Sequence, residues 1–139
     1  MSDAFLMNGG QLDVQHPTTL AWVEVGEVTT GDGPGGSGAV IPVTHWKSTA
    51  IEKRMGLPDE GQFTFEVNCL FGDAGQTILR DGRSSRTQLN FRVTYADTGA
   101  TVDAFAGFVL QARRTGLTVD NVVKLALTVE ITGALVTTL

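Results

Sequence analysis

The residue types that most often perform catalysis or bind metals are few and scattered in this chain. The two histidines, His16 and His45, have no second histidine, cysteine or carboxylate at a metal-site spacing such as H-E-x-x-H. The only cysteine, Cys69, lies in an alternating apolar segment, where a small buried side chain is more common than a nucleophile. We therefore predict no catalytic residues, no metal site and no cofactor.

Serines and glycines give no clearer sign of chemistry. Ser84 and Ser85 stand beside arginines without a nearby histidine, and no G-x-S-x-G occurs. Residues 31–36 match G-x-G-x-x-G, but the β-rich residues 39–43 follow instead of the helix that a dinucleotide site requires, and no Gly-Lys-Ser/Thr is present. We interpret residues 31–38 as a mobile loop. A triad assembled in space from distant residues stays open at this point.

Length, composition and charge narrow the possible classes of protein. The chain has 139 residues, of which 42% are hydrophobic and 18% charged, typical of one folded domain and not of a disordered chain. No apolar run approaches the roughly 20 residues of a membrane span, and the N-terminus lacks the pattern of a secretory signal. The net charge is −5 and no basic stripe exists, which argues against tight nucleic-acid binding. An acidic surface suits a wall along which DNA slides without sticking.

Alternation of apolar and polar residues predicts a mainly β fold. It is clearest where Phe63, Phe65, Val67, Cys69 and Phe71 alternate with polar residues. The predicted strands are residues 20–28, 39–44, 62–71, 89–95, 101–113 and 123–131. We expect an antiparallel β-sandwich or open barrel over residues 19–139, preceded by an N-terminal arm at residues 1–18.

Two segments interrupt the strands. Asp73 stands three residues before Gln76 in a capping pattern, which predicts a short flanking helix over about residues 74–82, ending at Gly82. Residues 45–61 mix charges, Pro58 and two glycines, which predicts a long extended loop leaving the core. Its apolar side chains suggest docking on another subunit. Long strands also leave sheet edges that identical neighbours in a ring could complete.

Several stretches, taken in order, resemble the tail tube proteins of lambda-like long-tailed bacteriophages. They are WVEVGEV at 22–28, GPG at 33–35, IPVT at 41–44, STAIE at 48–52, GLPDEG at 56–61, FTFEVN at 63–68 and LTVEITG at 127–133. The resemblance covers about residues 19–134. This sequence departs from the family in its glycine-dense loop and at His45-Trp46-Lys47, which affects the details of the ring-to-ring contact.

The resemblance implies a non-enzymatic virion protein with a fold related to the type VI secretion tube protein. Such proteins form hexameric rings that stack into the hollow tail tube conducting phage DNA into the host. Implied partners are other copies of the chain, the tail tip or initiator, the tail terminator and the tape measure protein, with assembly in the host cytoplasm and no membrane contact. Lambda's own protein adds a C-terminal immunoglobulin-like domain, which we do not expect in a chain ending at Leu139.

The resemblance and the strand pattern together predict two sets of site residues. Neutral and acidic side chains on the polar strand faces would let phosphates pass the lumen. The lumen candidates are Gln62, Thr64, Glu66 and Asn68, followed by Lys124, Thr128 and Glu130. The inter-ring candidates in the long loop are Trp46, Lys47, Ile51, Glu52, Lys53, Arg54, Met55, Leu57 and Asp59.

Other classes of protein remain open from sequence. One is another tube-like or connector protein, such as a tail terminator, a contractile-tail tube subunit or a secretion tube subunit. Another is a monomeric β-sandwich binding module, which needs clustered exposed aromatic residues, for which only Trp22 and Trp46 are candidates. An enzyme would need a pocket of converging polar groups, and no segment indicates one.

Overall fold

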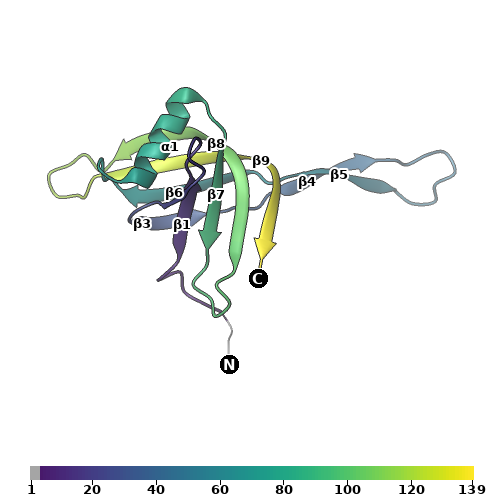
Figure 1. Cartoon of the computed structure of the whole chain (residues 1–139). Helices are drawn as coiled ribbons and strands as arrows, with labels where there is room; N and C mark the ends of the chain where they lie inside the picture. The colour runs from purple at the N-terminus through teal and green to yellow at the C-terminus, as the bar shows by residue number, and fades with distance from the viewer. Residues whose placement is uncertain (1–3) are drawn as a thin grey trace.

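The computed structural model describes residues 4–139 and contains one helix and nine strands in that range (Figure 1). The strands are β1 (Gln11–Gln15), β2 (Trp22–Glu24), β3 (Val28–Asp32), β4 (Ser37–Pro42), β5 (Lys53–Asp59), β6 (Gln62–Asn68), β7 (Leu89–Thr94), β8 (Val102–Thr115) and β9 (Lys124–Thr138). The helix is α1 (Ala74–Ser85). The prediction of a mainly β fold with one short helix is confirmed.

Seven strands form one antiparallel sheet, and β4 and β5 form a separate two-stranded ribbon. The order in the sheet is β2-β1-β7-β8-β9-β6-β3, and the two ends of this order do not pair, so the sheet is not closed into a barrel. Every neighbouring pair is antiparallel.

The sheet is curled into two layers, and the two longest strands, β8 and β9, each contribute one half to each layer. Of β8, only the first half pairs with β7, and of β9, only the first half pairs with β6. We call β2, β1, β7 and the adjoining halves of β8 (102–107) and β9 (131–138) the β7 layer. We call β3, β6 and the remaining halves of β9 (124–130) and β8 (109–115) the β6 layer.

Irregularities in β8 and β9 produce the turn from one layer into the other. Register shifts occur between Ala104 and Ala106 and between Val109 and Gln111. A Cβ at Gly107 would lie 2.5 Å from the Glu130 carbonyl oxygen, so the strands approach closely at the bend. Gly133 has a φ of +84°, which a residue with a side chain rarely adopts.

The core lies between the two layers and under α1. Phe105 of the β7 layer meets Phe63 of the β6 layer at 5.5 Å between ring centroids and stacks on Phe91 at 5.4 Å. The predicted alternation is confirmed for Phe63, Phe65 and Val67, which are buried. It is wrong for Phe71, which is 65% exposed because β6 ends at Asn68. The remaining buried hydrophobic residues are Leu12, Val14, Val25, Ile78, Leu79, Leu89, Val93, Val109, Leu125, Leu127, Val129 and Ile131.

The predicted helix is confirmed at its start but extends beyond the predicted end. Asp73 caps it by accepting a hydrogen bond from the Gln76 main-chain N–H at 3.0 Å. Gly82 does not end the helix; a Cβ there would lie 2.7 Å from Leu89 Cδ1, so this glycine is required by packing. The chain leaves the helix at Arg86, whose φ is +56°.

The prediction of a long loop over residues 45–61 is partly wrong. Residues 53–59 form β5, which pairs with β4, from Pro42 opposite Lys53 to Ser37 opposite Asp59. Only residues 43–52 connect these strands. The ribbon and its connecting loop, residues 37–59, project away from the sheet, and we call them the arm (Figure 1).

The predicted N-terminal boundary near Thr19 is also wrong. Residues 11–15 form β1, which lies between β2 and β7 and buries Leu12 and Val14 in the core. Residues 1–3 of the predicted arm lie outside the described residues.

The first predicted strand and the glycine-rich loop after it have different limits from those expected. Residues 20–28 contain β2 and the start of β3, separated at Val25 to Glu27. Gly31 and Asp32 belong to β3, and Ser37 and Gly38 belong to β4, so only residues 33–36 form a connection.

Candidate functional site

The side chains considered for chemistry have local structural partners. His16 Nδ1 accepts hydrogen bonds from the main-chain N–H groups of Thr18 and Thr19, each at 3.1 Å. In the loop of the arm, His45 Nε2 lies 3.3 Å from Glu52 Oε2. Cys69 is half-buried against the core. These contacts order turns and loops.

The serines of α1 make helix hydrogen bonds of the same local kind. Ser85 donates to the Asp81 carbonyl at 2.8 Å, and Ser84 donates to the Arg80 carbonyl at 3.4 Å. Within residues 4–139, no group of three or more histidine, cysteine or acidic residues is placed to hold a metal ion. The single helix in this range is too short and too polar to cross a membrane.

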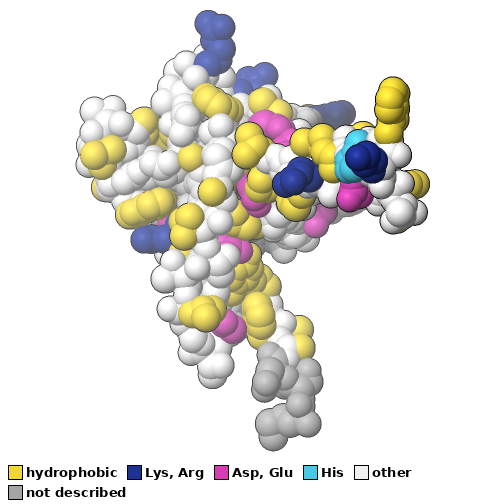
Figure 2. Space-filling view, turned by 90° about the vertical axis from the view of Figure 1, so that its right-hand side faces the viewer, with side chains coloured by type: hydrophobic (Ala, Val, Ile, Leu, Met, Phe, Trp, Pro, Cys, Tyr) yellow, Lys and Arg dark blue, Asp and Glu magenta, His cyan; other side chains and the backbone are white. Residues whose placement is uncertain are grey.

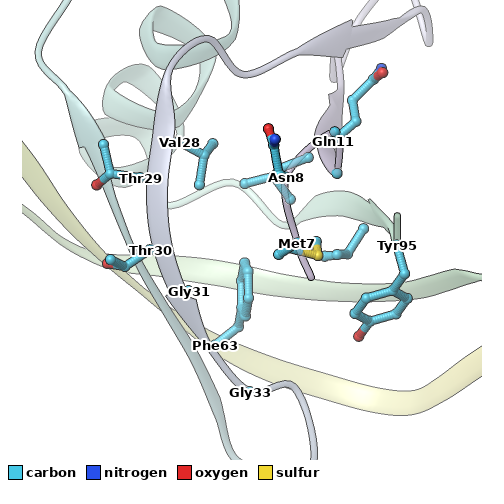
Figure 3. A pocket seen from close by; sticks show the side chains of 14 residues that line it. Met7, Asn8, Gln11, Val28, Thr29, Thr30, Gly31, Gly33, Phe63 and Tyr95 are labelled. Carbon is cyan, nitrogen blue, oxygen red and sulfur yellow. The ribbon is translucent and has the colours of Figure 1, made fainter. Parts of the chain in front are cut away.

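A cavity of about 520 Å³ lies at the open seam of the sheet, between β3 and residues 7–12 (Figure 3). β3 forms one wall, residues 7–12 form the other, and Phe63 points between them. Among the described residues of its lining, Tyr95 is the only titratable one. Burial, together with the hydrogen bond that its hydroxyl donates to Asp103, raises the pKa of Tyr95 to about 12. Like any tyrosine, Tyr95 is neutral near neutral pH, so the described part of the lining presents no ionised side chain.

The seven lumen candidates all lie on one face of the β6 layer. Three cross-strand pairs place them side by side: Gln62 with Glu130, Thr64 with Thr128, and Asn68 with Lys124. Glu66 lies on the same face, because it alternates with the buried Phe65 and Val67. This polar surface continues onto neighbouring strands through Thr30, Asp32, Gln111 and Arg113.

Charged side chains of both signs occur on this face, and one pair of them is in contact. Lys124 Nζ lies 3.6 Å from Glu66 Oε1, and the Gln62 side chain donates to Glu130 Oε2 at 2.9 Å. The charged residues of this face are three acidic ones, Asp32, Glu66 and Glu130, and two basic ones, Lys124 and Arg113. The face is therefore polar, mixed in charge and slightly acidic.

The β6 layer has a free edge on each side. Within residues 4–139, β3 pairs with β6 alone, and all five of its residues are exposed. On the opposite side, residues 109–115 of β8 pair only with β9 among the strands of residues 4–139. Unpaired edges of this length are templates for another strand.

Strand direction makes these two edges compatible with each other. The direction alternates across β3, β6, β9 and β8, because each pair is antiparallel. β3 and residues 109–115 therefore run in opposite directions. If identical copies are related by rotation about a common axis, the β8 edge of one copy meets the β3 edge of the next in antiparallel orientation.

The inter-ring candidates all lie on the arm, whose apolar side chains have little cover. Trp46 and Leu57 are 104% and 91% exposed, and further exposed apolar residues are Val40, Ile41, Val43, Ile51 and Met55. Figure 2 shows yellow side chains gathered with charged ones over the projecting arm. Such a concentration on a two-stranded ribbon indicates a surface that is covered in an assembly.

Sequence reasoning missed the two edges themselves. Residues 109–115 read as the continuation of one strand, and nothing in that run shows that β7 stops pairing at Gly107. One signal could have pointed to the β8 edge. The polar residues Gln111, Arg113 and Thr115 alternate along the strand and continue the polar face beyond β9.

Comparison with known proteins identifies the family. The model of the lambda-like phage tail tube protein family matches residues 4–138. No curated protein sequence matches the chain.

Two solved structures share the fold at low sequence identity. A hybrid structure of the SPP1 tail tube, from solid-state NMR and cryo-EM, is 12% identical with a TM-score of 0.64, over 92% of this chain and 75% of that chain. The anti-feeding prophage baseplate, a six-fold symmetrised cryo-EM structure, is 6% identical with a TM-score of 0.73, over 99% of this chain and 97% of that chain. Since the family match spans nearly the whole chain, this protein belongs to the lambda-like phage tail tube family and is a structural component of the virion tail.

Proposed function

We propose that six copies of this chain form a ring whose inner wall is a continuous antiparallel barrel made of the β6 layers. The observation that carries the proposal is the pair of free edges, β3 and residues 109–115, which run in opposite directions on the two sides of one layer. Each contact is head-to-tail, so a closing rotation yields a ring without unpaired edges. The number six is supported by the six-fold symmetry of the similar baseplate structure.

The polar face of the β6 layer then lines the lumen, with the seven candidates from Gln62 to Glu130 facing the DNA. Its opposite face is the hydrophobic core, so the polar face is the surface of this layer available to solvent. With three acidic and two basic side chains, each polar face carries a net negative charge, which disfavours the binding of phosphates. The protein thereby acts as a passive conduit and performs no catalysis.

Stacked rings held by the arms form the tube. Trp46, Lys47, Ile51, Glu52, Lys53, Arg54, Met55, Leu57 and Asp59 are the proposed contacts between rings. At its two ends the tube meets the tail tip or initiator and the tail terminator, and its lumen holds the tape measure protein before DNA passes.

Electron microscopy of the purified full-length protein, at increasing concentration, tests this function. Hollow tubes with stacked six-fold rings are expected. Single rings that never stack indicate a terminator-like role, and a protein that stays monomeric at every concentration contradicts the proposal.

A further inference from the structure

A second apolar surface lies at the end of the β6 layer opposite to the arm. Phe71, Leu117, Val119 and Val122 are 65%, 71%, 101% and 64% exposed, and we call these four residues the cap. They come from the connection between β6 and α1 and from the loop between β8 and β9. These segments are joined by the Cys69 main-chain N–H, which donates to the Val123 carbonyl at 2.9 Å.

Register places the arm and the cap at opposite ends of the same strands. β6 begins at Gln62, three residues after the arm ends at Asp59, and finishes at Asn68 opposite Lys124, where the loop between β8 and β9 closes. Figure 1 shows this loop on one side of the molecule and the arm on the other. The strands between them form the proposed wall of the lumen.

From this placement we propose that the cap is the docking surface for the arm of another copy in the adjacent ring. The inference rests on the proposed stacking of rings in one orientation. Such stacking brings the arm end of one ring against the cap end of the next, so each copy gives one arm and receives one. The contact covers apolar side chains on both surfaces, which neither subunit covers alone.

The flanks of the cap suit a rigid acceptor. The Arg80 and Arg114 guanidinium groups lie 5.2 and 5.7 Å from the Phe71 ring centroid, within the range of cation–π contacts. Gly116 and Thr118 tighten the loop through a hydrogen bond of 2.8 Å between the Thr118 N–H and the Gly116 carbonyl. The arm offers exposed apolar side chains along its whole length, from Leu57 near its base to Trp46 in its loop.

Cysteine cross-linking in assembled tubes tests the contact. Val119→Cys is combined in turn with Trp46→Cys, Ile51→Cys and Leu57→Cys, and tubes are treated with a flexible thiol cross-linker. At least one pair should give a ladder of dimers, trimers and longer chains, because the arm-to-cap contact is open-ended along the tube. The single variants, which all retain Cys69, should give no ladder. As the matched control, Val136→Cys takes the place of Val119→Cys in the same pairs. Val136 is an exposed valine of the β7 layer, away from the cap.

The outcomes separate this inference from the proposed function. If tubes form but no cysteine in the arm cross-links to Val119→Cys, or if Val136→Cys cross-links more efficiently, the cap is not the acceptor. The proposal that the protein forms tubes would still hold. Absence of tubes in the unmodified protein contradicts the proposed function itself.

A second measurement needs no variant. Hydrogen exchange of the unmodified protein should show residues 116–122 and the arm gaining protection together when tubes form. Protection gained by the arm with no change at residues 116–122 also overturns the inference.

Discussion

At the scale of single residues, a buried glutamine joins three separate segments. Gln76 is completely buried, accepts a hydrogen bond from the Leu70 N–H at 2.9 Å, and donates to the carbonyls of Gly26 and Asn68 at 3.1 and 2.9 Å. Asp73, besides capping α1, accepts from the Gly26 N–H at 3.1 Å. The start of α1 is thereby fixed to the connection between β2 and β3 and to the end of β6.

Replacing this glutamine should destabilise the fold more than a substitution on the polar face. Gln76→Leu keeps a similar volume but leaves three half-buried main-chain groups without these partners, so the free energy of unfolding should fall by about 2–4 kcal/mol. Gln62→Leu, on the exposed side of β6, is the matched control and should change it by no more than about 0.5 kcal/mol. Urea denaturation measures both. Equal midpoints for the two variants would show that the hydrogen bonds of Gln76 contribute little.

The tyrosine at the seam gives the fold a dependence on alkaline pH. The pKa of Tyr95 is raised from 10.0 to about 12, first by burial and then by Asp103. Folding thus favours its neutral form, and this contribution to stability is fully present below pH 10 and lost as pH rises through 12. Absorbance titration of the only tyrosine should show the raised pKa, and Tyr95→Phe should flatten the fall in thermal midpoint over this range. A midpoint that falls equally in the variant contradicts the prediction.

A charge reversal on the polar face tests which surface the DNA meets. Glu66→Lys removes a half-exposed pair with Lys124, worth about 0–1 kcal/mol, so folding and assembly should persist. Repeated around a ring, the new lysines would bind phosphates and slow DNA ejection at low salt, and added salt should restore the rate. Glu24→Lys, on the exposed strand β2, is the control and should leave ejection unchanged. An unchanged rate in Glu66→Lys would place this face away from the lumen.

At the scale of elements, the arm is the least supported part of the chain. Its two strands pair only with each other in a ribbon separate from the main sheet, and isolated two-stranded ribbons are marginally stable in water. Hydrogen exchange should therefore be fast for residues 38–58 in the free subunit and slow in the tube, while β6 stays protected in both. Equal protection of the arm in the two states would contradict its role between rings.

The strands that sequence predicted well are those with one face in the core. The alternation of Phe63, Phe65 and Val67 identifies β6, and that of Leu125, Leu127 and Val129 identifies β9, because burial on one side imposes a period of two. β1 was missed because its apolar alternation is limited to Leu12 and Val14, between a glycine pair and His16-Pro17.

Elements that contribute little to the core were harder to predict. β5 contains Gly56 and Pro58, which normally argue against a strand, but a ribbon with free outer edges tolerates proline. The same limit applies to the site residues. Alternation predicted that the seven lumen candidates share a face, whereas the identity of the free edges depends on where β7 stops pairing with β8, which is a property of the whole sheet.

At the scale of the whole molecule, some strand edges of the sheet are paired and others are free. β8 and β9 bend so that their first and second halves complete different layers, and the β6 layer is left with two free edges of opposite direction. The arm extends from one end of this layer, and the cap lies at the other. In the proposed assembly, the free edges join copies around a ring, and the arm and the cap join rings along the tube.

A cryo-EM reconstruction of the assembled tube tests the central claim most directly. The expected map has six copies per ring, with β3 of each copy paired antiparallel to residues 109–115 of its neighbour and Glu66 facing the lumen. A map in which these two edges are apart, or in which the polar face of the β6 layer points away from the lumen, would contradict the account.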